Sequence, residues 1–65
     1  MSLGKNIRIV RVSRELTLAE LARRVGVTAN YMSLIEGGKR TPSLRRLEAV
    51  AAALDVPSGF LLRDS

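Results

Sequence analysis

The side chains of this 65-residue chain favour binding over catalysis. The sequence has no cysteine and no histidine, so thiolate nucleophiles, imidazole bases, disulfides and the usual zinc ligands are all absent from it. Serine, threonine and carboxylate groups alone do not assemble a nucleophile with its base. The sequence therefore predicts neither an enzyme nor a protein that needs a metal or another cofactor.

Charge placement gives the first positive indication. Eleven Lys and Arg against six Asp and Glu give a net charge of +5, which favours an anionic partner, although a solvated surface explains the composition alone equally well. The short neutral stretch 28–30 stands between the pairs Arg23-Arg24 and Lys39-Arg40. Cations bind phosphates of any sequence, whereas small polar side chains can approach base edges. This arrangement is typical of a surface that reads double-stranded DNA.

The elements that must position these residues are helices. Apolar residues recur at spacings of three and four, and alternation with period two is absent. Five short helices are predicted, at 4–15, 18–25, 29–36, 44–54 and 58–62. Their inward-facing residues are expected to be Leu3, Ile7, Val10, Leu21, Ala22, Val25, Met32, Ile35, Leu44, Leu47, Val50, Ala51 and Leu54.

Local signals fix the ends of the central helices. "TLAE" is a capping box in which Thr17 and Glu20 bind each other's backbone amides. Gly26 can adopt the left-handed conformation that ends a helix, and Thr28 and Ser43 are good N-caps. Helix, short glycine turn and helix form the helix-turn-helix signature, whose second helix lies in the major groove of DNA.

The totals predict one domain over 1–65, with the helix-turn-helix core at 17–36. Residues 1–3 are consistent with a cloning remnant, so nothing is based on Met1 or Ser2, and residues 63–65 are expected to fray. No apolar run approaches the length of a membrane span, and no signal peptide is recognisable. A cytoplasmic protein is expected.

The motifs "LAELA", "VGV", "YMSLIEGGKRTPSL" and "AAALDVP" resemble those of the phage repressor and Cro-like (XRE) helix-turn-helix family, and the resemblance extends from Leu3 to Leu62. It implies a compact, all-α, five-helix, lambda-repressor-like domain that binds operator DNA as a homodimer and regulates transcription. It also implies an ion pair between Arg11 and Glu36. Two residues depart from the family pattern: Leu18 replaces a frequent Gln, and Leu34 replaces a polar or basic residue.

Residues from the two helices and the following loop are the candidate contacts. The side chains expected to read bases are Thr28, Ala29, Asn30 and Ser33, because Asn can bind adenine at two atoms and a methyl group can meet thymine. The expected phosphate contacts are the Leu18 amide, Tyr31, Lys39, Arg40, Ser43 and Arg45.

Several of these residues have a structural alternative. Asn30 could cap its helix locally, and the Tyr31 ring could pack beside the fourth helix instead of binding phosphate. A merely solvated side chain is as good an interpretation for each of Arg14, Arg24, Arg46 and Arg63.

The resemblance implies a dimer interface at the C-terminal end, with Pro57, Gly59, Phe60 and Arg63 as candidates, although Phe60 could instead plug the core. Two-fold pairing requires a near-palindromic site. Ile9 and Val12 lie on the outer side of the first helix, so we hypothesise that another chain or a further domain covers them. Two isolated surface aliphatics are the alternative.

A sequence-specific DNA-binding regulator, most simply a repressor, is the leading interpretation. An additional effector or sensor domain outside this chain is compatible with it. The alternative is a protein-interaction module that docks partners through Leu18, Leu34, Ile9 and Val12.

Overall fold

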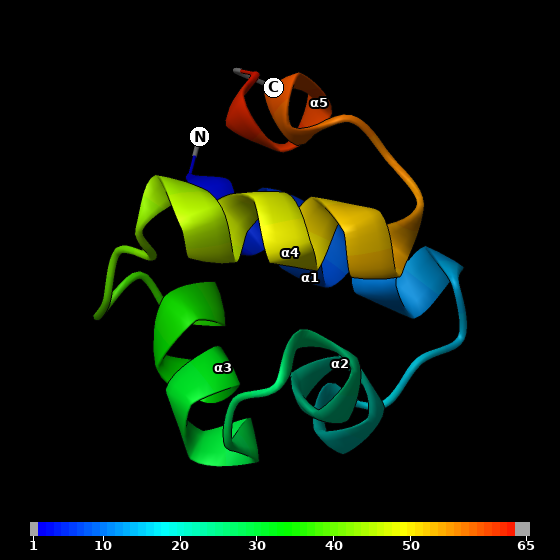
Figure 1. Ribbon diagram of the computed structural model, residues 1–65, viewed down its shortest axis with the longest axis vertical. Helices are drawn as coiled ribbons and strands as arrows, with labels where there is room; N and C mark the ends of the chain where they lie inside the picture. The colour runs from blue at the N-terminus through cyan, green and yellow to red at the C-terminus, as the bar shows by residue number, and fades with distance from the viewer. Residues whose placement is uncertain (1, 64–65) are drawn as a thin grey trace.

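The computed structural model describes residues 2–63, and every regular element among them is a helix (Figure 1). The five helices are α1 (Leu3–Ser13), α2 (Leu18–Val25), α3 (Ala29–Glu36), α4 (Leu44–Leu54) and α5 (Ser58–Leu62). The all-α, five-helix fold predicted from the sequence is confirmed. None of the helices in the described range has the length and apolar character that a membrane crossing requires.

Helices α1 and α4 lie next to each other through the middle of the molecule (Figure 1). Helices α2 and α3 lie on one side of this pair, and α5 lies on the opposite side. The core is aliphatic, and its buried residues come from all five helices: Ile7, Val10, Leu21, Ala22, Met32, Ile35, Leu47, Val50, Ala51, Leu54 and Leu61. Helix α3 thus packs against both α1 and α2.

Hydroxyl side chains begin four of the helices. The Oγ1 atoms of Thr17 and Thr28 and the Oγ atoms of Ser2 and Ser43 each accept a hydrogen bond from the amide three residues on. At α2 the capping box is complete, because the Glu20 carboxylate also accepts from the Thr17 amide at 2.7 Å. This backbone hydrogen bond lowers the pKa of Glu20. The N-terminal ends of the helix-turn-helix are therefore fixed by local contacts.

The predicted end of the first helix is wrong by two residues. Helix α1 ends at Ser13 because Glu15 adopts a left-handed conformation, with φ of 59°. The Leu16 amide then donates back to the Arg11 carbonyl at 3.2 Å, and this bond closes the helix. Gly26, in contrast, ends α2 in the predicted left-handed conformation, with φ of 88°.

One expectation about the start of α4 is also wrong. Leu44 does not join the core, because its side chain is 67% exposed at the first position of α4. A three-and-four pattern identifies the face of a helix, but not how far along it the neighbouring helices extend. Arg63 was expected to fray, and its carbonyl accepts a hydrogen bond from the buried Asn6 side chain at 2.8 Å. Asp64 and Ser65, also predicted to fray, lie outside the described residues.

The N-terminal segment is part of the fold rather than an appendage. Ser2 caps α1, and Leu3 packs against the core. Gly4 lies so close to the C-terminal end of α3 that a Cβ atom there would overlap the carbonyl oxygen of Ile35 and lie 2.6 Å from that of Glu36. Glycine therefore permits the close approach of α1 to α3.

Candidate nucleic-acid interface

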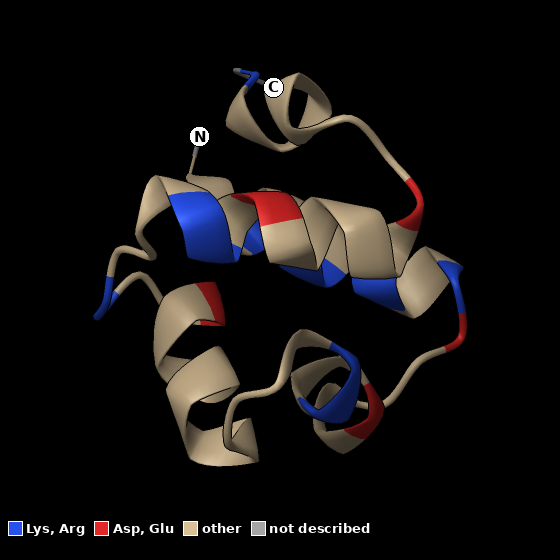
Figure 2. Ribbon diagram, viewed as in Figure 1, with Lys and Arg blue, Asp and Glu red and all other residues tan. Residues whose placement is uncertain are grey.

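Helix α3 presents an uncharged outer face. Its buried side is made by Met32 and Ile35, so the opposite side is turned to solvent. The four residues expected to read bases are all exposed there: Thr28, Ala29, Asn30 and Ser33. Figure 2 shows that α3 carries no charge except at its last residue, Glu36, while Lys and Arg mark the loop and the helix that follow it. The neutral stretch thus lies on an accessible helix surface.

The N-terminal turn of α3 leaves a polar side chain available for recognition. Thr28 serves as the N-cap, since its Oγ1 accepts from the Tyr31 amide at 3.0 Å. Within the part of the chain that the structure describes, the Asn30 amide group makes no hydrogen bond, so the alternative of a local cap at Asn30 is wrong. Its donors and acceptor are therefore free to contact a ligand.

The loop after α3 holds the cations in place. The amides of Lys39 and Arg40 both donate to the Leu34 carbonyl, at 2.9 and 3.2 Å, which folds the loop back onto the end of α3. Both side chains are exposed, as are those of Ser43 and Arg45 at the start of α4. Although the Ser43 Oγ accepts from the Arg46 amide at 3.2 Å, its own proton can still be donated to an anion.

Tyr31 lies between the exposed residues of α3 and these cations. Its ring is half-buried against the core, as the packing alternative anticipated. The guanidinium carbon of Arg40 is 5.5 Å from the ring centroid, and that of Arg46 is 5.3 Å from it. The contact with Arg46 joins α3 directly to the first turn of α4.

An ion pair joins α1 to the end of α3. Arg11 Nε donates to Glu36 Oε2 at 2.7 Å, and its second terminal nitrogen donates to Oε1 at 3.1 Å. The side chains are 14% and 5% exposed, respectively. The hydrogen bond to Glu36 raises the pKa of Arg11. The third nitrogen donates to the Leu16 carbonyl at 2.8 Å, so one guanidinium ties α1, the turn after it and α3 together.

The two residues that depart from the family pattern are only partly exposed. Leu18 and Leu34 are both half-buried, and Leu18 packs against the core. As the first residue of α2, Leu18 contributes an amide that has no partner within its helix. Such an amide can bind a phosphate even though the side chain cannot.

The candidate dimer residues lie at the opposite end from α2 and α3. Pro57, Gly59, Phe60 and Arg63 are all exposed. The alternative of Phe60 as a core plug is wrong, because Phe60 is 38% exposed and its ring contacts the Arg63 guanidinium at 4.1 Å instead. Ile9 and Val12 are 56% and 59% exposed, as predicted.

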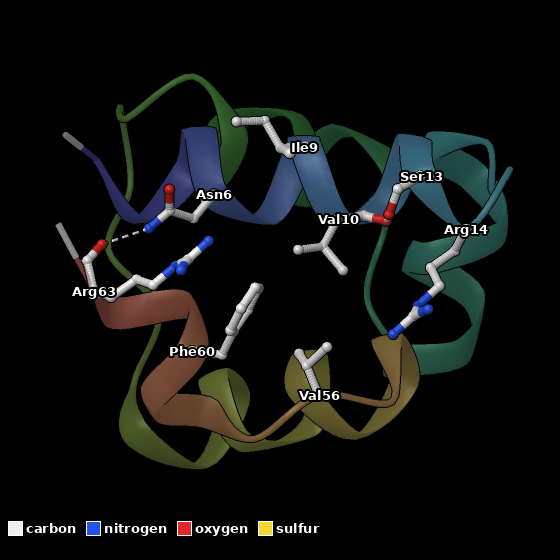
Figure 3. Close-up of a pocket in the computed structure, with 8 residues that line it drawn as sticks. All are labelled: Asn6, Ile9, Val10, Ser13, Arg14, Val56, Phe60 and Arg63. Atoms are coloured by element: carbon white, nitrogen blue, oxygen red, sulfur yellow. Dashed lines mark hydrogen bonds between the residues drawn. The ribbon is translucent and has the colours of Figure 1, made fainter. Parts of the chain in front are cut away.

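A groove of about 250 Å³ runs between α1 and α5. Ile9 contributes to the lining, and Figure 3 shows Val10 on one wall and Val56 and Phe60 on the other, with Arg63 and Arg14 toward the two ends. The side chains of Ile9 and Phe60 are thus parts of one apolar surface, although they are far apart in the sequence.

Sequence reasoning missed the structural roles of Arg14 and Asn6. Arg14 caps the C-terminal end of α4, since its Nε donates to the Leu54 carbonyl at 2.9 Å. Asn6 holds the end of α5 by donating to the Leu61 and Arg63 carbonyls, both at 2.8 Å. Its position on the inner face of α1, one residue before Ile7, was the available hint, because a polar residue there must find a buried partner.

Comparisons with known proteins agree with this geometry. A family model described as a helix-turn-helix domain matches residues 2–63. The immunity repressor protein of Bacillus phage phi105 is 39% identical over 56 residues, which cover 86% of this chain and 39% of the phage protein. The transcriptional regulator SinR of Bacillus subtilis (strain 168) is 41% identical over 61 residues, covering 92% of this chain and 55% of SinR. The chain thus spans between two fifths and just over half of these relatives.

The structural comparison matches the same kind of protein. A crystal structure of SinR, the master regulator for biofilm formation, in complex with DNA superposes with a TM-score of 0.88 at 39% identity. The match covers 94% of this chain and 98% of that one. Since both the family model and the relatives extend over nearly all of its length, the chain belongs to the helix-turn-helix family of phage repressor and Cro-like transcriptional regulators.

Proposed function

We propose that this chain is a sequence-specific DNA-binding domain of a transcriptional regulator, most simply a repressor. The observation that carries the proposal is the uncharged, exposed face of α3 beside a cluster of exposed cations (Figure 2). A duplex needs both, because phosphates supply salt-dependent affinity and base edges supply specificity. The names of the relatives, which are repressors and transcriptional regulators, support it.

In this proposal α3 enters the major groove and the loop grips the strand. The reading face, which contacts base edges, consists of Thr28, Ala29, Asn30 and Ser33. The Leu18 amide, Tyr31, Lys39, Arg40, Ser43 and Arg45 contact phosphates. Since the Arg11–Glu36 pair fixes α3 against α1, the reading face is held rigidly against the rest of the domain. A regulator of this kind acts where the chromosome is, so a cytoplasmic location belongs to the same proposal.

We further propose that two copies pair through Pro57, Gly59, Phe60 and Arg63. The exposed Phe60 and the apolar groove beside it support an interface at this end (Figure 3). Pairing there leaves α3 of each copy accessible and requires a near-palindromic operator with half-sites about one helical turn, roughly 34 Å, apart. Sedimentation of the wild type and of Phe60→Glu tests this: a dimer that becomes a monomer is expected, and an unchanged mass would refute the interface.

Selection of bound sequences from a random duplex library is the central experiment. A defined, two-fold symmetric site is expected. Asn30→Ala should then lose roughly 1 to 3 kcal/mol of discrimination at one or two base pairs while keeping its affinity for random DNA. An unchanged site preference in Asn30→Ala would contradict the assignment of the reading residue.

Arg40→Ala should weaken binding to every sequence alike and reduce the salt slope by about 1. Arg24→Ala is the matched control, because it removes the same charge from α2 near the C-terminal end of α4, among Arg14, Leu54 and Asp55. Equal losses in both variants would indicate general attraction to net charge rather than a built surface.

A protein-interaction module is the second candidate, and the exposed Ile9 and Val12 favour it. Titration with mixed duplex DNA at two salt concentrations separates the two functions. The regulator predicts a steep salt slope, whereas the module predicts little binding at either concentration.

A further inference from the structure

Two arginine side chains converge on one aromatic ring at the edge of the reading face. The Arg40 guanidinium comes from the loop after α3, and the Arg46 guanidinium comes from the first turn of α4. Their central carbons lie 5.5 and 5.3 Å from the centroid of the Tyr31 ring. Both distances are within the range of about 6 Å at which a cation is attracted by the face of an aromatic ring.

No carboxylate explains this arrangement. Among residues 2–63, the ion pairs involve Glu36 with Arg8 and Arg11, so neither Arg40 nor Arg46 has an acidic partner there. Two like charges that lie close to one ring repel each other. An anion placed between or beside them would offset this repulsion.

The ring itself is held firmly. Tyr31 belongs to the first turn of α3, where its amide is bonded to the Thr28 cap, and its side chain packs against the core. Arg46 has the equivalent place in α4, where its amide is bonded to the Ser43 cap at 3.2 Å. The two guanidinium groups therefore lie near a ring that packs against the core one residue from Asn30.

We propose that Tyr31 is a positioning residue whose ring holds Arg40 and Arg46 in place to receive the phosphates of the strand beside the reading face. This inference rests on the proposed DNA-binding function. It adds Arg46 to the phosphate contacts and replaces the phosphate contact assigned above to Tyr31, whose contribution then comes from the face of its ring rather than from its hydroxyl group.

The expected loss of affinity follows from how far the ring restricts the two arginine side chains before DNA binds. An arginine that is already held loses less conformational freedom on binding than one that moves freely, and each such side chain accounts for roughly a two- to tenfold change in affinity. Two side chains held by one ring predict that loss of the ring weakens binding by at least about fivefold. The charges remain in such a variant, so the salt slope stays the same.

Three variants of the domain, each titrated by fluorescence anisotropy with the selected duplex and with random DNA, test the proposal. Tyr31→Phe keeps the ring and should bind within about twofold of the wild type. Tyr31→Leu should bind both duplexes at least about fivefold more weakly with an unchanged salt slope, whereas Arg46→Ala should reduce the slope by about 0.9. A Tyr31→Phe variant as weak as Tyr31→Leu would assign the contact to the hydroxyl and overturn the proposal.

Coupling between the residues separates positioning from general damage to the fold. In an Arg40→Ala/Arg46→Ala background, Tyr31→Leu should change the affinity by less than about twofold, because nothing is left for the ring to hold. The same loss in both backgrounds would show that Tyr31 acts independently of the arginines. Thermal melting identifies any variant that is unfolded at the temperature of the titration.

Side-chain proton shifts of the free wild-type protein keep the test decisive if Tyr31→Leu does not fold. A ring shifts protons that lie over its face upfield, so the Hδ protons of Arg40 and Arg46 should be upfield of those of Arg24, and unshifted resonances would refute the contact. A wild type that binds no duplex at all would refute the proposed function instead, and the phosphate role of the ring with it. A wild type that binds, together with an equally tight Tyr31→Leu, would refute the positioning role alone.

Discussion

Removal of Arg11 should destabilise the domain more than removal of any other cation in the described range. Its guanidinium makes two hydrogen bonds to the Glu36 carboxylate, at 2.7 and 3.1 Å, and one to the Leu16 carbonyl at 2.8 Å. Arg11→Ala leaves the Glu36 carboxylate, with a side chain only 5% exposed, without these donors. The variant therefore exposes the cost of a buried charge that has lost its partner.

The structure also limits that cost. Breaking a buried pair from one side costs about 3 to 5 kcal/mol. Arg8 Nε lies 3.8 Å from Glu36 Oε1, but the Arg8 side chain is 68% exposed, so it can replace only part of the lost interaction. We expect a loss of about 2 to 4 kcal/mol in the free energy of unfolding, a large share of the stability of so small a domain. Each lost kcal/mol lowers the melting temperature by about 4 to 8 °C.

A double-mutant cycle isolates the pair from the other contacts of Arg11. Unfolding by urea is measured for the wild type, Arg11→Ala, Glu36→Ala and the double variant, with Arg24→Ala as the control for loss of a surface charge. A coupling energy above about 1 kcal/mol is expected for groups in direct contact. Strictly additive effects, or an Arg11→Ala protein that melts with the wild type, would refute the reasoning.

Two further predictions concern stability. Gly4→Ala should destabilise the fold by about 1 to 2 kcal/mol, because overlap with the Ile35 and Glu36 carbonyls outweighs the higher helix propensity of alanine. Gly59→Ala, whose Cβ would meet no atom within 4 Å, should be neutral or slightly stabilising in the same thermal melts, and equal effects of the two would contradict the close-approach argument. The lowered pKa of Glu20 means that its capping contribution is complete above the ordinary pKa of 4.5 and is lost as the pH falls through the lower folded value. Glu20→Gln should therefore remove part of the acid sensitivity seen in melts below pH 4.5, and an unchanged pH profile would exclude this role.

The sequence predicted best the features that depend on neighbouring residues. Thr17, Thr28 and Ser43 begin their helices as expected because a capping hydroxyl needs only the amide three residues on. Gly26 ends α2 for a similar reason, since a left-handed residue strongly favours glycine. The end of α1 was missed because Glu15 adopts the same conformation without that signature.

Features that depend on residues distant in the sequence were harder to predict from it. The exposure of Leu44 follows from the extent of neighbouring helices, which periodicity does not report. For Arg14 a solvated side chain was as good an interpretation as any contact, because only the packing of α1 against α4 brings it to the Leu54 carbonyl. Nothing in the sequence around Gly4 indicated its role. Glycine is needed there because a Cβ atom would overlap the backbone of α3.

The candidate site depends on both neighbouring and distant residues. Only the parts that depend on neighbouring residues could be predicted from the sequence. The neutral face of α3 follows from local order, since residues 29, 30 and 33 lie away from the buried Met32 and Ile35 and Thr28 caps the same helix. The arrangement of the cations does not, because Arg40 and Arg46 belong to a loop and a different helix and meet only at the Tyr31 ring. The residues proposed to recognise bases could thus be predicted from the sequence. The arrangement of the residues proposed to bind phosphates depends on how α4 packs beside α3. Substitutions that move α4 should accordingly weaken binding to every duplex before they alter which duplex is preferred.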